Sequence, residues 1–165
     1  MNPTEVPTPH ETDPAVMNAD FQDCFETTIS IQGRSALELA LSTFASTPRW
    51  VNAAMTLRNR IVRLVGLKDL GLLSSVDPSR AADRYRVGDR VGIFTIFAMS
   101  HDEVVFGDSD RHLTVRVHIR LPRERPGVVS VSTVVRTRNA LGRLYMVAVV
   151  PMHKRIVPAM LARLA

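Results

Sequence analysis

The chain has 165 residues, of which 45% are hydrophobic and 22% are charged, with a formal net charge of +5. This length and apolar content suit one domain with a substantial core and argue against two domains. The single cysteine, Cys24, excludes an intramolecular disulfide and any multi-cysteine metal site. No cationic start precedes an apolar run and no segment approaches membrane-spanning length, so we expect a cytoplasmic protein without membrane insertion.

The positive charge is a weak indication of nucleic-acid binding. Only Lys68 and Lys154 are lysines among the 21 basic residues, and the arginines are scattered instead of forming a run. An arginine bias of this kind is typical of a GC-rich bacterial genome, and dispersed charge does not make a basic tail. Nucleic acid is therefore an unlikely partner.

The first 18 residues contain four of the ten prolines among Thr, Glu and Asp. With little apolar surface to bury, residues 1–18 are predicted to form a flexible tail, and residues 19–165 a single α+β domain. The β-forming residues between Phe21 and Ile31 then predict a first strand that ends at Gly33.

Two helices are predicted directly after this strand. Ser35-Ala-Leu-Glu38 has the pattern of a capping box, in which the serine and the glutamate each satisfy a free backbone N–H at a helix start. Thr47-Pro48 begins a second helix with proline at the first helical position, where its missing N–H costs little. Gly66 is the predicted C-terminal stop.

The region from Lys68 to Arg90 is irregular and is predicted to be a long connection or flap. Three β-like runs follow, at 91–98, at 103–121 with a break at 107–110, and at 128–137. Between 112 and 121, apolar residues alternate with polar ones, which predicts one buried face and one solvated face.

The last segment, 139–165, has apolar residues at steps of three and four, which predicts a long amphipathic helix. Asn139 is a good N-cap, and Pro151 and Pro158 should bend the helix. The element order predicts an α+β fold: a curved antiparallel sheet of about five strands wrapped on a long C-terminal helix, with two short helices after the first strand. This is a helix-grip-like arrangement; a cystatin-like fold is the competitor, but it usually places its main helix first.

Several short motifs together resemble the bacterial domain-of-unknown-function 2867 family over about residues 20–164. The family tends to have Pro-Phe-His where this chain has Pro151-Met152-His153. The resemblance implies a helix-grip or START-like fold and, because similar domains occur fused behind a Rossmann domain, a nucleotide-dependent oxidoreductase as a partner; it implies no established reaction. The motifs are Pro48-x-Trp50-Val51, Leu57-Arg-Asn-Arg-Ile-Val62, Gly107-Asp-x-Asp-x-His-Leu113, Asn139-x-Leu-Gly-Arg-x-Tyr-Met146 and Pro151-x-His-Lys-Arg-Ile-Val157.

No metal or cofactor is expected. Asp108, Asp110 and His112 suggest a metal site, but the glycine and the glutamate of an EF-hand are missing, so the aspartates are predicted to build a hairpin turn. The chain also lacks the glycine-rich phosphate loops, the Gly-x-Ser-x-Gly elbow and the His-Glu-x-x-His zinc motif.

Three functions remain open. The first is a non-catalytic binding module for a small, mostly apolar ligand, held in a pocket between the sheet and the last helix. The second is an interaction or homodimerisation domain, and the third binds a polyanion through the polar sheet face, with Arg116, His118, Arg120, Arg136 and Arg138. Residues proposed to bind the ligand are Arg58, Asn59, His112, Tyr145 and His153.

Overall fold

The computed structural model describes residues 2–7, 16–64 and 71–164, with only the backbone at 62–64. Gly66 and part of the predicted 68–90 connection lie outside the described residues. The strands are β1 (Thr4–Glu5), β2 (Phe21–Thr28), β3 (Arg90–Val91), β4 (Phe94–Met99), β5 (Glu103–Ser109), β6 (Leu113–Arg120) and β7 (Val128–Thr137). The helices are α1 (Ala36–Ala45), α2 (Arg49–Leu64), the short 3-10 helix η2 (Ala82–Arg84) and α3 (Ala140–Leu161).

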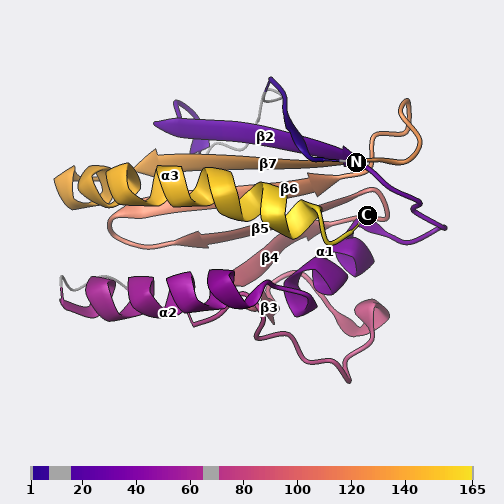
Figure 1. Cartoon of the computed structure of the whole chain (residues 1–165), viewed down its shortest axis with the longest axis horizontal. Helices are drawn as coiled ribbons and strands as arrows, with labels where there is room; N and C mark the ends of the chain where they lie inside the picture. The colour runs from indigo at the N-terminus through magenta and orange to yellow at the C-terminus, as the bar shows by residue number, and fades with distance from the viewer. Residues whose placement is uncertain (1, 8–15, 65–70, 165) are drawn as a thin grey trace.

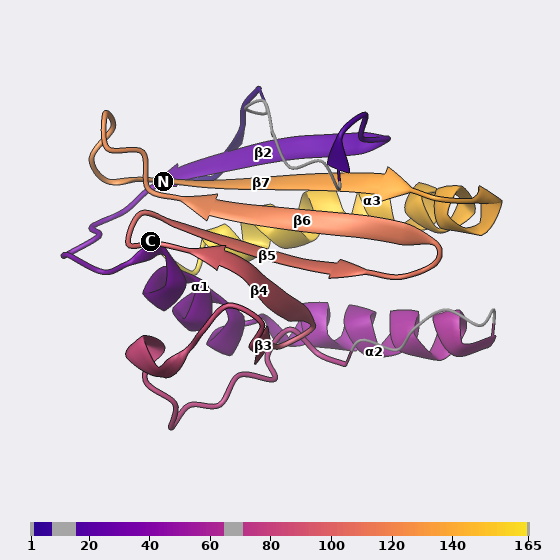
Figure 2. The same ribbon diagram turned by 180° about the vertical axis from the view of Figure 1, so that it is seen from behind.

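The strands form one antiparallel sheet in the order β1-β2-β7-β6-β5-β4-β3 (Figures 1 and 2). The five longer strands match the predicted sheet, and the two-residue strands β1 and β3 extend its edges. Part of the predicted tail is therefore paired to the sheet: Thr4 lies opposite Glu26, and Lys154 Nζ donates to Glu5 Oε1 at 2.8 Å. Val16 is also buried.

All three α-helices lie on the same side of the sheet (Figure 1). In Figure 2 the strands lie nearest the viewer and α3 is seen behind β6 and β7. This arrangement confirms the predicted α+β class, with two helices after the first long strand and a long C-terminal helix across the sheet. Strand alternation aims every second residue toward the helices, which places the apolar residues of β6 and β7 beneath α3.

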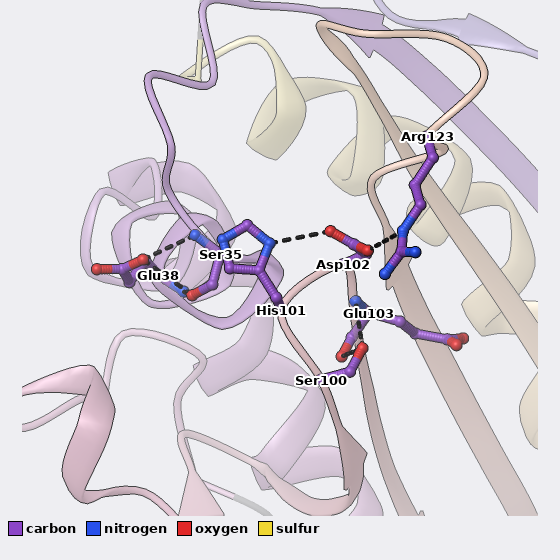
Figure 3. A network of polar contacts seen from close by, with 7 residues as sticks. All are labelled: Ser35, Glu38, Ser100, His101, Asp102, Glu103 and Arg123. Atoms are coloured by element: carbon purple, nitrogen blue, oxygen red, sulfur yellow. Dashed lines mark hydrogen bonds and ion pairs between the residues drawn. The ribbon is translucent and has the colours of Figure 1, made fainter.

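Helix α1 is fixed to the turn between β4 and β5 (Figure 3). The capping box is confirmed: Ser35 N–H donates to Glu38 Oε2 at 2.7 Å, and Glu38 N–H donates to Ser35 Oγ at 3.3 Å. The next amide, that of Ala36, donates to the carbonyl of His101 at 2.8 Å. Within this turn His101 Nδ1 lies 2.9 Å from Asp102 Oδ1. The two side chains form an ion pair when the imidazole is charged.

The prediction that the outer face of β6 is solvated is wrong. Thr114, Arg116 and His118 are all buried. The guanidinium of Arg116 lies 3.7 Å from the ring centroid of Phe97 on β4, an arrangement that covers the charge with an aromatic face. His118 Nδ1 lies 3.0 Å from Glu103 Oε1.

Helix α3 has 22 residues and continues through Pro151 and Pro158. The predicted N-cap is confirmed, since Asn139 Oδ1 accepts from the backbone N–H of Gly142 at 3.0 Å. By length and composition α3 is long and apolar enough to cross a membrane, so the expectation that no segment approaches this length is wrong. In the structure its inner side faces the sheet, and Met160 and Leu161 join the core.

Candidate functional site

A cavity of about 460 Å³ lies between the inner face of the sheet and the three α-helices. Its volume is within the range of small-molecule sites, roughly 300–1,000 Å³. Sheet residues at every second position form its floor, and α3 forms much of its cover. The lining residues from the sheet are Phe21, Phe94, Asp108, Leu113, Val115, Val117, Ile119, Val129, Val131, Thr133 and Val135. Those from α3 and the segment after it are Tyr145, Met146, Ala148, Val149, Met152, His153, Ile156, Val157, Met160, Leu161 and Leu164.

Helix α2 lines the cavity from the other side. Leu57 and Ile61 both line it although they are 59% and 54% exposed. Large apolar side chains that face both a cavity and solvent mark the place where a cavity opens. The cavity is therefore accessible alongside α2, where a ligand could enter without unfolding the sheet.

One polar part of the wall joins α2 to α3. Arg58 Nε donates to Tyr145 Oη at 3.0 Å, and the guanidinium carbon lies 5.3 Å from the centroid of the tyrosine ring. Asp108 and Asp110 line the cavity as well. Two of the predicted ligand-binding residues thus contact each other here.

A second polar part of the wall lies further along α3. His153 Nε2 is 3.2 Å from both carboxylate oxygens of Asp23 on β2. The His153 ring packs edge-on against Phe21, with centroids 5.7 Å apart. Asp23 is buried, and a buried carboxylate costs free energy unless it has a partner, so His153 is the group that offsets this cost.

The other two predicted residues, Asn59 and His112, do not line the cavity. Asn59 is buried, and its side chain accepts from Arg58 Nη1 at 2.8 Å and donates to the carbonyl of Gly71 at 2.8 Å. It therefore holds Arg58 from behind and fixes α2 to the following loop.

His112 belongs to the junction between β6 and α3. Its Nε2 accepts from Arg111 Nε at 2.8 Å, so in the neutral ring Nδ1 carries the hydrogen and donates to Asn139 Oδ1 at 3.2 Å. Asp110 Oδ1 accepts the backbone N–H groups of His112 and Leu113 at 2.7 and 2.9 Å, which is the predicted hairpin turn. Among the described residues no three His, Cys, Asp or Glu side chains are grouped to hold a metal ion.

Sequence reasoning missed Asp23 and Thr133. Asp23 lies between Phe21 and Phe25 in the inward register of β2, and Thr133 interrupts the inward valines of β7. A polar residue at an apolar position of an alternating strand is the signal that could have found both. Their neighbour Cys24 points the other way and is buried; burial raises the pKa of its thiol above the ordinary range, which disfavours a nucleophilic role.

The model of a family described as proteins of unknown function, the domain-of-unknown-function 2867 family, matches residues 15–160. The chain belongs to this family. No curated protein and no solved structure matches the chain. Three of the five motifs that carry the resemblance to the 2867 family contact one another near the start of α3. The 107–113 and 139–146 segments meet through His112 and Asn139, and the 57–62 and 139–146 segments meet through Arg58 and Tyr145.

Glycines allow close backbone contact at this junction and within the β5–β6 hairpin. A Cβ atom on Gly142 would lie 2.3 Å from the carbonyl oxygen of His112, and one on Gly107 would lie 2.5 Å from the carbonyl oxygen of Val115. Real Cβ atoms essentially never approach other atoms so closely. The family motifs of this protein therefore include residues that fix the start of α3 against the β5–β6 hairpin, at one end of the cavity.

Proposed function

We propose that this member of the 2867 family is a non-catalytic binding module for a small, mostly apolar ligand. The observation that carries the proposal is the cavity of about 460 Å³ between sheet and α3, walled mainly by aliphatic side chains and open beside α2. Apolar cavities with a few convergent polar groups are the usual form of a ligand site. We further propose that the sheet and α3 form a helix-grip, START-like arrangement.

The polar groups of the wall set the orientation of the ligand in this proposal. Arg58 and Tyr145 provide N–H and O–H groups at one place, and His153 provides a ring nitrogen at another. Asn59 and His112 act indirectly, since Asn59 positions Arg58 and His112 positions the start of α3.

Two valines of α3 give a matched test. Val149 lines the cavity, whereas Val147, two residues earlier, is 72% exposed on the outer side of the helix. Val149→Trp should occupy part of the cavity and lower the affinity for decan-1-ol at least tenfold by calorimetric titration, while Val147→Trp should keep the affinity of the wild type. Failure of the wild type to bind decan-1-ol and comparably apolar compounds, or equal affinity in both variants, would contradict the proposal.

A second candidate function is docking through the outer side of α3. Leu144 and Val147 are one turn apart and 68% and 72% exposed, so they form an apolar strip that nothing in the described chain covers. The occupant would be a Rossmann-type oxidoreductase or a second copy of the chain, in the bacterial cytoplasm. Light scattering distinguishes the two functions: a dimer that Leu144→Glu converts to a monomer favours docking, and a monomeric wild type counts against a second copy.

A further inference from the structure

In the Asp23–His153 pair, one ring nitrogen of the histidine does not take part in the contact with the carboxylate. The ionised carboxylate of Asp23 only accepts hydrogen bonds, so the hydrogen between the two residues belongs to His153 Nε2. In the neutral imidazole the other nitrogen, Nδ1, is then an acceptor. Among the described residues Nδ1 has no hydrogen-bond partner, and the His153 side chain is 19% exposed and lines the cavity.

Thr133 provides a second hydrogen-bonding group, its hydroxyl, at the same place. It lies opposite Asp23 in the β2–β7 register, lines the cavity and is 3% exposed. Within the described chain its Oγ1 is buried without a hydrogen-bond partner. A threonine hydroxyl has one donor and two lone pairs, and buried groups of this kind normally find partners.

The other polar part of the wall differs in this respect. Arg58 and Tyr145 already bond to each other, and Asn59 bonds to Arg58. At one corner, His153 and Thr133 are both next to Asp23 and both line the cavity, and within the described chain no protein group uses the acceptor of the first or the hydroxyl of the second. Asp23 behind them holds negative charge, which disfavours a second carboxylate in the same corner.

We propose that this corner binds an uncharged hydroxyl group carried by an otherwise apolar ligand. The ligand O–H donates to His153 Nδ1, and its oxygen accepts from Thr133 Oγ1 after rotation of the threonine about its Cα–Cβ bond. Asp23 acts as the positioning residue, because it holds the ring in the tautomer that accepts at Nδ1. The inference rests on the proposed binding function and names the chemical class of its ligand: a long-chain or cyclic alcohol in preference to an ether, and an ether in preference to an acid.

Three probes that share a ten-carbon chain and are of similar size test this order: decan-1-ol, its methyl ether 1-methoxydecane, and decanoate. Removing the donor of a hydrogen bond to a partly buried acceptor should weaken binding about tenfold, so the wild type should bind the alcohol about ten times more tightly than the ether. In Asp23→Asn/His153→Phe, which removes the acceptor but keeps a ring against Phe21 and leaves no unpaired charge, the ratio should fall close to one.

A nitrogen NMR measurement keeps the test independent of that variant's folding. In ¹⁵N-histidine-labelled wild type, the Nδ1 resonance of His153 should move when the alcohol is added and stay in place with the ether, while His112, whose two nitrogens are both bonded within the protein, should not respond to either. Thr27→Val is the control for Thr133→Val: Thr27 is also buried, its hydroxyl likewise has no hydrogen-bond partner among the described residues, and it does not line the cavity. Only Thr133→Val should weaken binding of the alcohol, because it removes the hydroxyl that donates to the ligand oxygen.

The outcomes separate the two proposals. Equal binding of all three probes with an unmoved His153 Nδ1 resonance would overturn the hydroxyl site and leave the binding module standing. Tighter binding of decanoate than of the alcohol would overturn it as well. If none of the probes binds the wild type, both the hydroxyl site and the proposed function fail.

Discussion

Substituting alanine for Gly142 tests the close junction at the start of α3. The added Cβ would lie 2.3 Å from the carbonyl oxygen and 3.1 Å from the carbonyl carbon of His112. Both atoms are backbone, so no flexible side chain can move aside. Ordinary contact begins near 3.4 Å, so the helix start must withdraw by roughly 1 Å.

Two effects of opposite sign set the size of the change. Alanine favours a helix over glycine by up to about 1 kcal/mol, which would stabilise the variant. Overpacking against a rigid wall costs roughly 1–3 kcal/mol, and the shift also strains the bond between Asn139 Oδ1 and the Gly142 amide. We expect a net loss of about 1–2 kcal/mol in the free energy of unfolding.

Urea denaturation followed by circular dichroism measures this change, with Ala140→Gly as the control. Ala140 lies in the same helical turn and is exposed, so its replacement reports the helix propensity alone, a loss of about 0.5–1 kcal/mol. If Gly142→Ala is as stable as the wild type or more stable, helix propensity dominates and the close contact with His112 is not a constraint.

Three further predictions concern other parts of the chain. Asn139→Ala should lower the free energy of unfolding by about 1 kcal/mol in urea denaturation, because it removes the cap of α3; no change would show that the cap is dispensable. The Asp102 carboxylate raises the pKa of His101 above 6.5, so the stability that the charged imidazole adds is complete below about pH 6.5 and is lost as pH rises through the folded pKa. Wild type should therefore exceed His101→Gln in urea midpoint by more at pH 5.5 than at pH 8.5, and a constant difference would contradict the ion pair. Cys24 should react with a thiol reagent slowly in the native state and rapidly in urea, since it is fully buried; rapid native reaction would place it at the surface.

Features that depend on neighbouring residues could be predicted from the sequence. The capping box of α1, the cap of α3 and the Asp110 turn each join residues within a few positions, so their chemistry is complete in a short segment. The inward face of β6 followed from strict alternation, and the position of α3 across the sheet followed from its length and its place at the end of the chain.

Features that depend on distant pairing could not be predicted. Burial of Arg116 requires Phe97, which comes from a strand two places away in the sheet. The pairing of His153 with Asp23 joins residues 130 positions apart, so a histidine on an apolar helix face gave no indication of its carboxylate partner. Asn59 was a candidate for direct ligand contact, but its orientation toward the loop at Gly71 is set by the tertiary packing of α2.

Methyl NMR during titration with decan-1-ol tests most directly whether the cavity holds a ligand. We expect saturable shifts for methyl groups of the cavity wall, such as Val131 and Ile156, with a single dissociation constant. Val104 and Ile96 are buried but do not line the cavity, and their methyl resonances should stay in place. Shifts absent from the wall, or spread equally over both groups, would contradict a ligand site between the sheet and α3.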